Sequence, residues 1–246
     1  MSLCRGGPER SIAPTMPTTH EMERRTVLLG ARRVSICPSF VAGVASGIIC
    51  LMSSTLDCHV AVVEAYLENT DETTADPVLV MLTGLPGTGK SHLARCLAEV
   101  IPFSIVESDR VRKTLFPNAQ YSGEESHWVH LTCHAVMEKL LKKGVRVIYD
   151  ATNLHERHRE QVYRLADDLG VKLIVVKVTA PEAVASARLQ GRQENKDEDQ
   201  GVSDADWRVY RRMARDVDPI RRNFVVVDTS RDPDRAITKL LRLIRS

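Results

Sequence analysis

The pattern of apolar and polar residues becomes regular from Pro77 onward. Short apolar runs of strand length alternate with longer stretches in which apolar residues recur at helical spacing. The runs predict strands at 78–82, 103–106, 145–149, 173–178 and 224–227, and the spacing predicts helices at 92–100, 126–141, 156–169, 181–189, 204–215 and 234–244. Alternating strands and helices are typical of a mostly parallel sheet covered on both faces. We therefore expect an α/β fold.

Residues 1–76 lack this alternation and are predicted to form a poorly ordered leader before a single domain at 77–246. Residues 1–33 are rich in Pro, Thr and Arg without periodicity. Residues 34–56 carry no charge and as a helix would be long enough to cross a bilayer, but five Ser, two Gly and one Pro dilute the apolar residues. A membrane span or signal and a dispensable leader are both open. In the second case a short helix runs from Ser54 or Thr55 to about Leu67.

Composition and charge exclude several classes of protein. With 43% hydrophobic and 27% charged residues, the 246-residue chain has the composition of a folded protein. Its net charge of +2 lacks the basic excess that a stable nucleic-acid complex needs, and 4% aromatic residues argue against a stacking platform for single strands. The six cysteines contain no CxxC pair and are predicted to be reduced thiols.

A phosphate-binding loop follows the first predicted strand. Residues 84–91 read GLPGTGKS and match GxxxxGK[ST] at every fixed position, between a strand and a helix. Glycines let the backbone turn its N–H groups toward phosphate oxygens, and the helix adds its positive end. We expect Lys90 to neutralise the β- and γ-phosphates of ATP and the Ser91 hydroxyl to hold Mg²⁺. The predicted nucleotide-binding residues are Gly84, Leu85, Pro86, Gly87, Thr88, Gly89, Lys90 and Ser91.

Two further carboxylates stand where predicted strands end. In ESDRVRK, Asp109 follows the second strand and Arg112 comes three residues later. Ligands of open α/β sheets bind beyond the carboxyl ends of strands, so Asp109 is expected to face the loop, to accept a hydrogen bond from an acceptor hydroxyl and to align it for attack on the γ-phosphate. Arg112 would bind an anion of the acceptor or the transferring group. The alternative is a helix-capping Asp with a solvated Arg. Asp150 ends the third strand and is predicted to hold Mg²⁺ through water or to act structurally.

These motifs, in this order, resemble the polynucleotide-kinase-like and zeta-toxin-like P-loop kinases, which share an ATP-binding P-loop domain of the AAA type. GLPGTGKS, then Ser108, Asp109 and Arg112, then DATN at 150–153 carry the resemblance, which covers about residues 77–230. It implies a three-layer P-loop fold whose five-stranded parallel sheet has the order 2-3-1-4-5, with a helical lid that bears arginines. It also implies that Asp109 is the base and that Thr229 lies where related kinases pass the adenine ring.

Arginines between the fourth and fifth strands are candidates for the lid. Arg188 and Arg192 are four residues apart and so share one face of a helix, from which both side chains would reach the phosphates. Trp207 and Tyr210, three apart, are expected to pack within the lid rather than stack on an acceptor.

One predicted helix carries a cluster of histidines. HWVHLTCH contains His127, His130, Cys133 and His134, and the histidine spacing of three and four places them on one helix face. They are either metal ligands or half-exposed histidines. We favour the second interpretation because no second cluster of suitable spacing completes a zinc site.

Together these features predict a P-loop kinase that uses ATP and Mg²⁺ to phosphorylate a hydroxyl of a small molecule or of a nucleic-acid end. A kinase that draws on ATP points to the cytoplasm and disfavours the membrane span. The alternative function is an ATP-binding and ATP-hydrolysing switch module without kinase activity. Asp109 distinguishes the two, because a kinase needs a carboxylate beside an acceptor pocket.

Overall fold

The chain divides into two compact units, Met1–Ala42 and Gly43–Ser246. The computed structural model describes residues 26–29, 32–35, 45–67, 72–194, 205–231 and 233–245. In the first unit, β1 (Thr26–Leu29) and β2 (Arg32–Ser35) pair as antiparallel strands, which the sequence pattern did not predict. Within residues 1–76, which we predicted to be poorly ordered, residues 1–25, 30–31, 36–44 and 68–71 lie outside the described residues.

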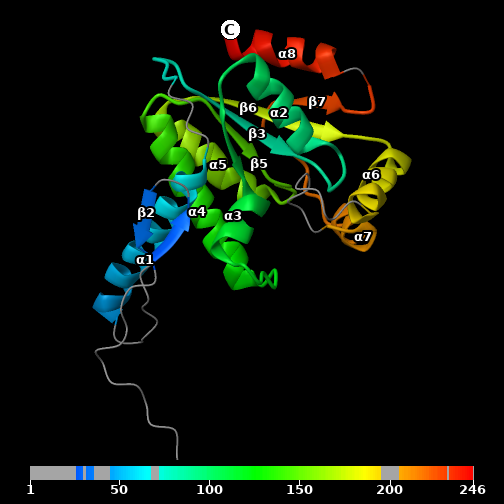
Figure 1. Ribbon diagram of the computed structural model, residues 1–246. Coiled ribbons are helices and arrows are strands. Elements are labelled where there is room, and N and C mark those ends of the chain that lie inside the picture. Colours follow the sequence, from blue (N-terminus) through cyan, green and yellow to red (C-terminus); the bar gives the residue numbers. More distant parts are fainter. Residues whose placement is uncertain are drawn as a thin grey trace, which may run out of the picture. The chain divides into compact units, whose positions relative to one another are not determined.

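A five-stranded parallel sheet organises the second unit (Figure 1). Its strands lie in the order β4-β5-β3-β6-β7, which is 2-3-1-4-5 when the five are counted along the chain, as expected. All five predicted strands are present, with ends shifted by one or two residues. They are β3 (Val78–Thr83), β4 (Ser104–Glu107), β5 (Val147–Asp150), β6 (Lys172–Thr179) and β7 (Phe224–Asp228).

Helices cover both faces of the sheet because side chains alternate along each strand. On β3, Val80 and Leu82 are buried under α2 (Lys90–Val100) and α8 (Pro233–Arg245), whereas Leu79 and Met81 are buried on the other face. The second face is covered by α3 (Ser108–Leu115), α4 (Gly123–Lys142) and α5 (Glu156–Leu169). Between β6 and β7, α6 (Glu182–Glu194) and α7 (Trp207–Ala214) occupy the predicted lid segment.

The first helix of this unit is longer than the sequence pattern suggests. It spans α1 (Ala45–Tyr66) instead of starting at Ser54 or Thr55. Val60, Val63 and Leu67 are buried in the core beside α4, and the Lys139 ammonium lies 2.7 Å from the Glu64 carboxylate. The compact unit therefore starts at Gly43 and includes α1, whereas we predicted a domain that begins at Pro77. Within the described residues, no helix combines the length and the apolar content needed to cross a membrane.

Candidate active site

The loop after β3 has the backbone shape that a phosphate cradle needs. Gly89 has a left-handed backbone (φ 89°) and precedes α2, which starts at Lys90. A Cβ atom on Gly84 would lie 2.3 Å from the backbone oxygen of Val178, so only glycine fits there. The loop is closed by the Thr88 hydroxyl, which donates to the Leu85 carbonyl at 2.7 Å.

The loop after β5 is hydrogen-bonded to the start of the phosphate loop. Gly84 N donates to Thr152 O at 3.0 Å, and the Thr83 hydroxyl donates to Asn153 O at 3.0 Å. The Asn153 amide in turn donates to Leu82 O at 2.8 Å. The DATN motif thus holds the base of the phosphate loop through its last two residues, which leaves Asp150 at the end of its strand to face the site.

Lys90 lies in a nearly closed environment with carboxylates nearby. Its side chain is buried, and Nζ donates to Leu85 O at 3.0 Å. Burial lowers the pKa of Lys90, while the Asp150 and Asp109 carboxylates raise it. A phosphate oxygen would replace the carbonyl as a stronger, charged partner.

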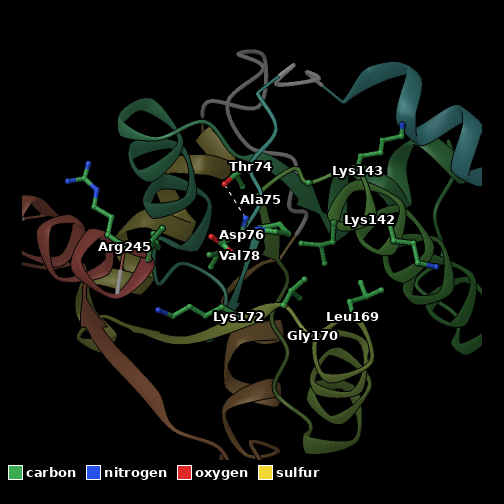
Figure 2. A pocket seen from close by; sticks show the side chains of 15 residues that line it. Thr74, Ala75, Asp76, Val78, Lys142, Lys143, Leu169, Gly170, Lys172 and Arg245 are labelled. Carbon is green, nitrogen blue, oxygen red and sulfur yellow. Dashed lines mark hydrogen bonds between the residues drawn. The ribbon is translucent and has the colours of Figure 1, made fainter.

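One cavity of about 520 Å³ at the carboxyl ends of β3, β4 and β5 brings together most of the predicted site residues, but Gly84, Leu85 and Thr88 of the loop do not line it. A ligand in this cavity would touch the loop, both strand-end carboxylates and a lid arginine at once. Its lining includes Pro86, Gly87, Gly89, Lys90, Ser91, Asp109, Arg112, Asp150 and Arg192. A second cavity of about 770 Å³ lies at the opposite end of the sheet, among Thr74–Val78, Lys142–Gly144, Gly170–Lys172 and Arg245, and no predicted site residue lines it (Figure 2).

The residues present fit a magnesium ion next to Ser91. Asp150 is buried, the nearby Ser91 side chain acts to lower its pKa, and its Oδ2 atom has no hydrogen-bond partner among the described residues. Burial raises the pKa of Asp150, and a bound cation would favour the carboxylate instead. A hydroxyl and a carboxylate are the hard oxygen ligands that Mg²⁺ takes together with phosphate and water.

Two acidic side chains at the end of β4 line the same cavity. Asp109 lies in the first turn of α3, is half-buried and makes no hydrogen bond or ion pair with the described part of the chain. Glu107, which the sequence reasoning missed, pairs in register with Asp150. Burial and the nearby Asp150 and Asp109 carboxylates raise the pKa of Glu107 to about 7. The only signal in the sequence was its position two residues before Asp109.

Arg112 is held in place and is not a solvated side chain. Its side chain is 11% exposed, its Nη2 atom donates to the Ser126 hydroxyl at 3.2 Å, and Nη1 lies 3.6 Å from the Glu125 carboxylate. Its guanidinium carbon lies 4.8 Å from the centre of the Tyr121 ring. Glu125 also accepts from the backbone of Gln120 at 2.9 Å, so one carboxylate fixes both the turn before α4 and this arginine.

Of the residues predicted for the lid and for the adenine site, Arg192 lines this cavity, whereas Arg188 and Thr229 do not. Arg188 donates to the Thr229 hydroxyl and to the Thr229 carbonyl, both at 2.9 Å. The Thr229 hydroxyl donates to Thr88 O at 2.7 Å. Arg188 lies one helical turn before Arg192 and meets the end of β7, so it braces the phosphate loop from behind, whereas Arg192 lines the cavity.

Helix α7 adds three residues that the sequence reasoning missed, namely Val209, Arg212 and Met213, to the cavity wall. The chain has many arginines, and nothing in the sequence distinguished Arg212 from its neighbours. Trp207 and Tyr210 stack on each other with ring centres 4.6 Å apart and pack against the α6 residues Ala185 and Leu189. The prediction that these two aromatic residues pack within the lid is confirmed.

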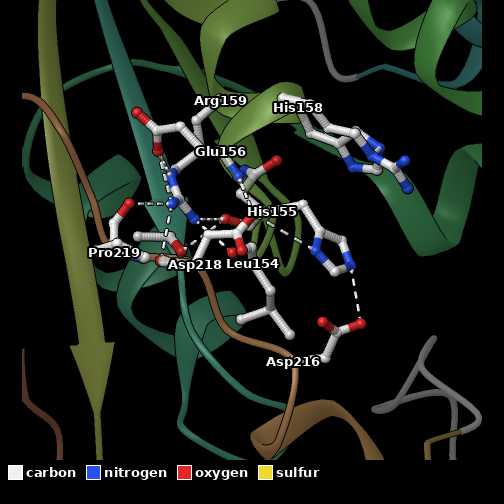
Figure 3. Close-up of polar contacts among 11 residues, drawn as sticks. Leu154, His155, Glu156, His158, Arg159, Asp216, Asp218 and Pro219 are labelled. Carbon is white, nitrogen blue, oxygen red and sulfur yellow. Dashed lines mark hydrogen bonds and ion pairs between the residues drawn. The ribbon is translucent and has the colours of Figure 1, made fainter.

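A buried arginine joins the segment after α7 to the loop after β5 (Figure 3). Arg159 is fully buried, and its Nε donates to the Glu156 carboxylate at 2.7 Å. The four other guanidinium N–H groups donate to backbone oxygens at 2.7–2.9 Å, two on Asn153 and Leu154 and two on Asp218 and Pro219. We call this set of contacts the Arg159 anchor. It fixes the chain on both sides of the cavity.

Comparisons with known proteins agree with this arrangement. Residues 79–220 match the AAA_33 family, described as an AAA domain. An adenylyl-sulfate kinase from Myxococcus xanthus (strain DK1622) is 33% identical over 114 residues, which are 45% of this chain and 62% of that enzyme. The chain thus matches less than two thirds of the length of that relative.

Solved structures share the fold at low identity. The APS kinase CysC of Mycobacterium tuberculosis, in complex with AMPPNP and APS, aligns over 70% of this chain and 100% of its own, with a TM-score of 0.53 and 17% identity. Kti12 of Chaetomium thermophilum, in complex with ADP-AlF3, aligns over 68% and 98%, with a TM-score of 0.54 and 17% identity. These likenesses do not confirm the narrower polynucleotide-kinase-like or zeta-toxin-like group. The match over residues 79–220 shows that the chain belongs to the AAA_33 family of AAA domains.

Proposed function

We propose that the protein is an ATP-dependent kinase that transfers the γ-phosphate to a hydroxyl group. The observation that carries the proposal is that the Asp109 carboxylate shares one cavity with Lys90 and Ser91. Because Asp109 makes no hydrogen bond or ion pair with the described residues, it is available to an acceptor. The similarity to an adenylyl-sulfate kinase supports the same reaction class.

The residues of the cavity divide the work of phosphoryl transfer. The loop N–H groups and Lys90 bind the β- and γ-phosphates. Ser91 and Asp150 would hold Mg²⁺, which would neutralise phosphate charge. Asp109 accepts the proton of the acceptor hydroxyl while the oxygen of that hydroxyl bonds to the γ-phosphorus. The bond from that phosphorus to the β,γ-bridging oxygen breaks, and ADP leaves with the electron pair. Arg112 and Arg192 stabilise the charge on the transferring group.

The acceptor is proposed to be a small molecule, with a nucleic-acid end as the alternative. A near-neutral net charge and few aromatic residues favour the small molecule. The finer resemblance to polynucleotide-kinase-like enzymes supports the alternative. Because the reaction consumes ATP, we propose that the protein works in the cytoplasm.

The test is a screen with radiolabelled ATP against 5′-hydroxyl oligonucleotides, nucleotide sugars and aminoglycosides. With the acceptor found, Asp109→Asn is expected to keep Mg-ATP affinity within about twofold and to lose about 10²- to 10⁴-fold in turnover, as removal of a general base does. Asp168→Asn, on an exposed part of α5, serves as the matched control. Unchanged turnover in Asp109→Asn would refute the assignment, and ATP hydrolysis without any labelled acceptor would favour the switch module.

A further inference from the structure

A third cavity adjoins the active-site cavity. It has a volume of about 790 Å³ and is lined by α4, the loop after β5, α5 and the end of α7. Four histidines line it alone, and a fifth, His130, lines both cavities, so we call it the histidine groove. The residues common to both cavities are Arg112, Tyr121, His130, Thr152, Arg212 and Met213. An acceptor whose hydroxyl lies at Asp109 would therefore extend directly into the groove.

Two buried imidazoles of the groove, those of His130 and His134, are uncharged hydrogen-bonding groups. Burial lowers the pKa of His130 and of His134 to about 4, which leaves both neutral near pH 7. His130 and His158 have ring centres 4.5 Å apart. Among the described residues, no three His, Cys, Asp or Glu side chains are arranged to hold a metal ion. The histidine cluster is thus not explained by a metal site in the part of the chain that the structure describes.

The fixed charges in the groove favour an anion. Its lining contains three arginines, Arg112, Arg157 and Arg212, and a single carboxylate, Asp216. Because Arg112 is already paired with the Glu125 carboxylate, an excess of one positive charge remains. The Asp216 carboxylate already lies 3.8 Å from the His155 ring. In contrast, the guanidinium group of Arg212 makes no hydrogen bond or ion pair with any described residue. It is therefore available to a ligand.

The structure also restrains the helix that carries Arg212. Helix α7 ends at Ala214, four residues before Asp218. Asp218 N donates to Leu154 O at 3.0 Å, and the Asp218 carboxylate accepts from Glu156 N at 2.8 Å. Together with the Arg159 anchor, these bonds tie the end of the α7 segment to the loop after β5. Because the backbone that carries Arg212 is already held in place, a ligand that binds Arg212 has a smaller entropic cost of ordering to overcome.

We propose that the histidine groove binds a second, anionic group of the phosphoryl acceptor through Arg212 and Arg157. The inference rests on the proposed function and narrows its substrate class to alcohols that also carry an oxyanion, a phosphate or a carboxylate. The guanidinium groups supply charge-assisted hydrogen bonds to this oxyanion, and the His130 and His134 imidazoles add further donors. Charge at this end of the acceptor orients the hydroxyl toward Asp109.

Binding is tested with the full-length protein saturated with Mg-ADP, so that the phosphate loop is filled. Glycerol 3-phosphate, inorganic phosphate and glycerol are titrated while histidine ring signals are followed by NMR. We expect the His130 and His158 signals to move in a saturable way with glycerol 3-phosphate but not with glycerol, and His59 and His92, outside the groove, to stay in place. Absence of saturation, or equal movement of the outside histidines, would overturn the proposal. Saturation with inorganic phosphate but not with glycerol 3-phosphate would refute the proposal that the bound anion is part of the phosphoryl acceptor.

Matched arginine variants locate the anion. Arg212→Gln is expected to weaken glycerol 3-phosphate binding about tenfold, the loss typical of one charged hydrogen bond. Arg211→Gln, an exposed neighbour on α7 that lines neither cavity, is expected to leave binding unchanged. Equal weakening in both variants, or none in Arg212→Gln, would refute the site. Asp109→Asn is expected to block phosphoryl transfer but not anion binding. The two measurements therefore test the proposed function and the anion site separately.

Discussion

The Arg159 anchor leads to a quantitative prediction of stability. Arg159 uses all five of its N–H donors, one on the Glu156 carboxylate and four on backbone oxygens. Arg159→Met would remove these bonds and leave the buried Glu156 carboxylate unpaired, for which about 3–5 kcal/mol of unfolding free energy is the expected loss. Arg159→Lys keeps the charge but offers three donors from one point, so the expected loss is about 2–3 kcal/mol.

Urea unfolding followed by circular dichroism measures both losses. The control is Arg164→Met, which removes an exposed arginine from the same helix and should change the unfolding free energy by less than about 0.5 kcal/mol. A double-mutant cycle with Glu156→Gln separates the ion pair from the backbone bonds. A loss below about 1 kcal/mol in Arg159→Met would show that the contacts do not hold the two segments together.

Four further predictions concern the phosphate loop and its surroundings. Lys90→Ala should weaken Mg-ATP binding at least tenfold by calorimetry, because it removes a charged partner of two phosphates. Gly84→Ala should lower the unfolding free energy by about 1–3 kcal/mol in urea, because its Cβ would meet a backbone oxygen at 2.3 Å. Thr229→Val removes the hydrogen bonds from Thr229 to Thr88 and from Arg188, and should weaken ATP binding severalfold, whereas unchanged affinity would exclude bracing by Thr229. The folded protein raises the pKa of Glu107 from 4.5 to about 7 and so favours its protonated form; stability from this group is full below pH 4.5 and is lost as the pH rises to about 7. Urea unfolding at pH 5 and pH 8 should therefore show a smaller loss at pH 8 in Glu107→Gln than in the unchanged protein.

Much of the fold could be predicted because the buried strands are continuous apolar runs. The bounds predicted for α5 agree with the structure, and all five strands of the sheet were located. The strand order came from the resemblance, since apolar runs carry no information about which strands are neighbours. Helix α3 was missed because only Val111 among its eight residues is buried, so it has no apolar periodicity to detect.

The site was predictable where chemistry coincides with the end of a strand. Lys90, Asp109 and Asp150 follow three adjacent strands, so the topology brings them into one cavity. Residues whose role depends on packing between distant segments could not be found in this way. Arg212 lines the cavity because α7 returns beside the loop after β5, and the contact of Arg188 with Thr229 joins residues 41 positions apart that no spacing rule connects.

The packing of α1 against the core determines which fragments of this protein can fold. The family match covers residues 79–220, but α1, β7 and α8 lie outside that interval. Val63 and Leu240, both fully buried, belong to these outer elements. A fragment that contains only residues 79–220 would expose the apolar surfaces that α1 and α8 cover. It would also leave β6 as an unpaired edge strand that can associate with other chains. The smallest fragment that folds on its own is therefore expected to be longer than the interval that matches the family.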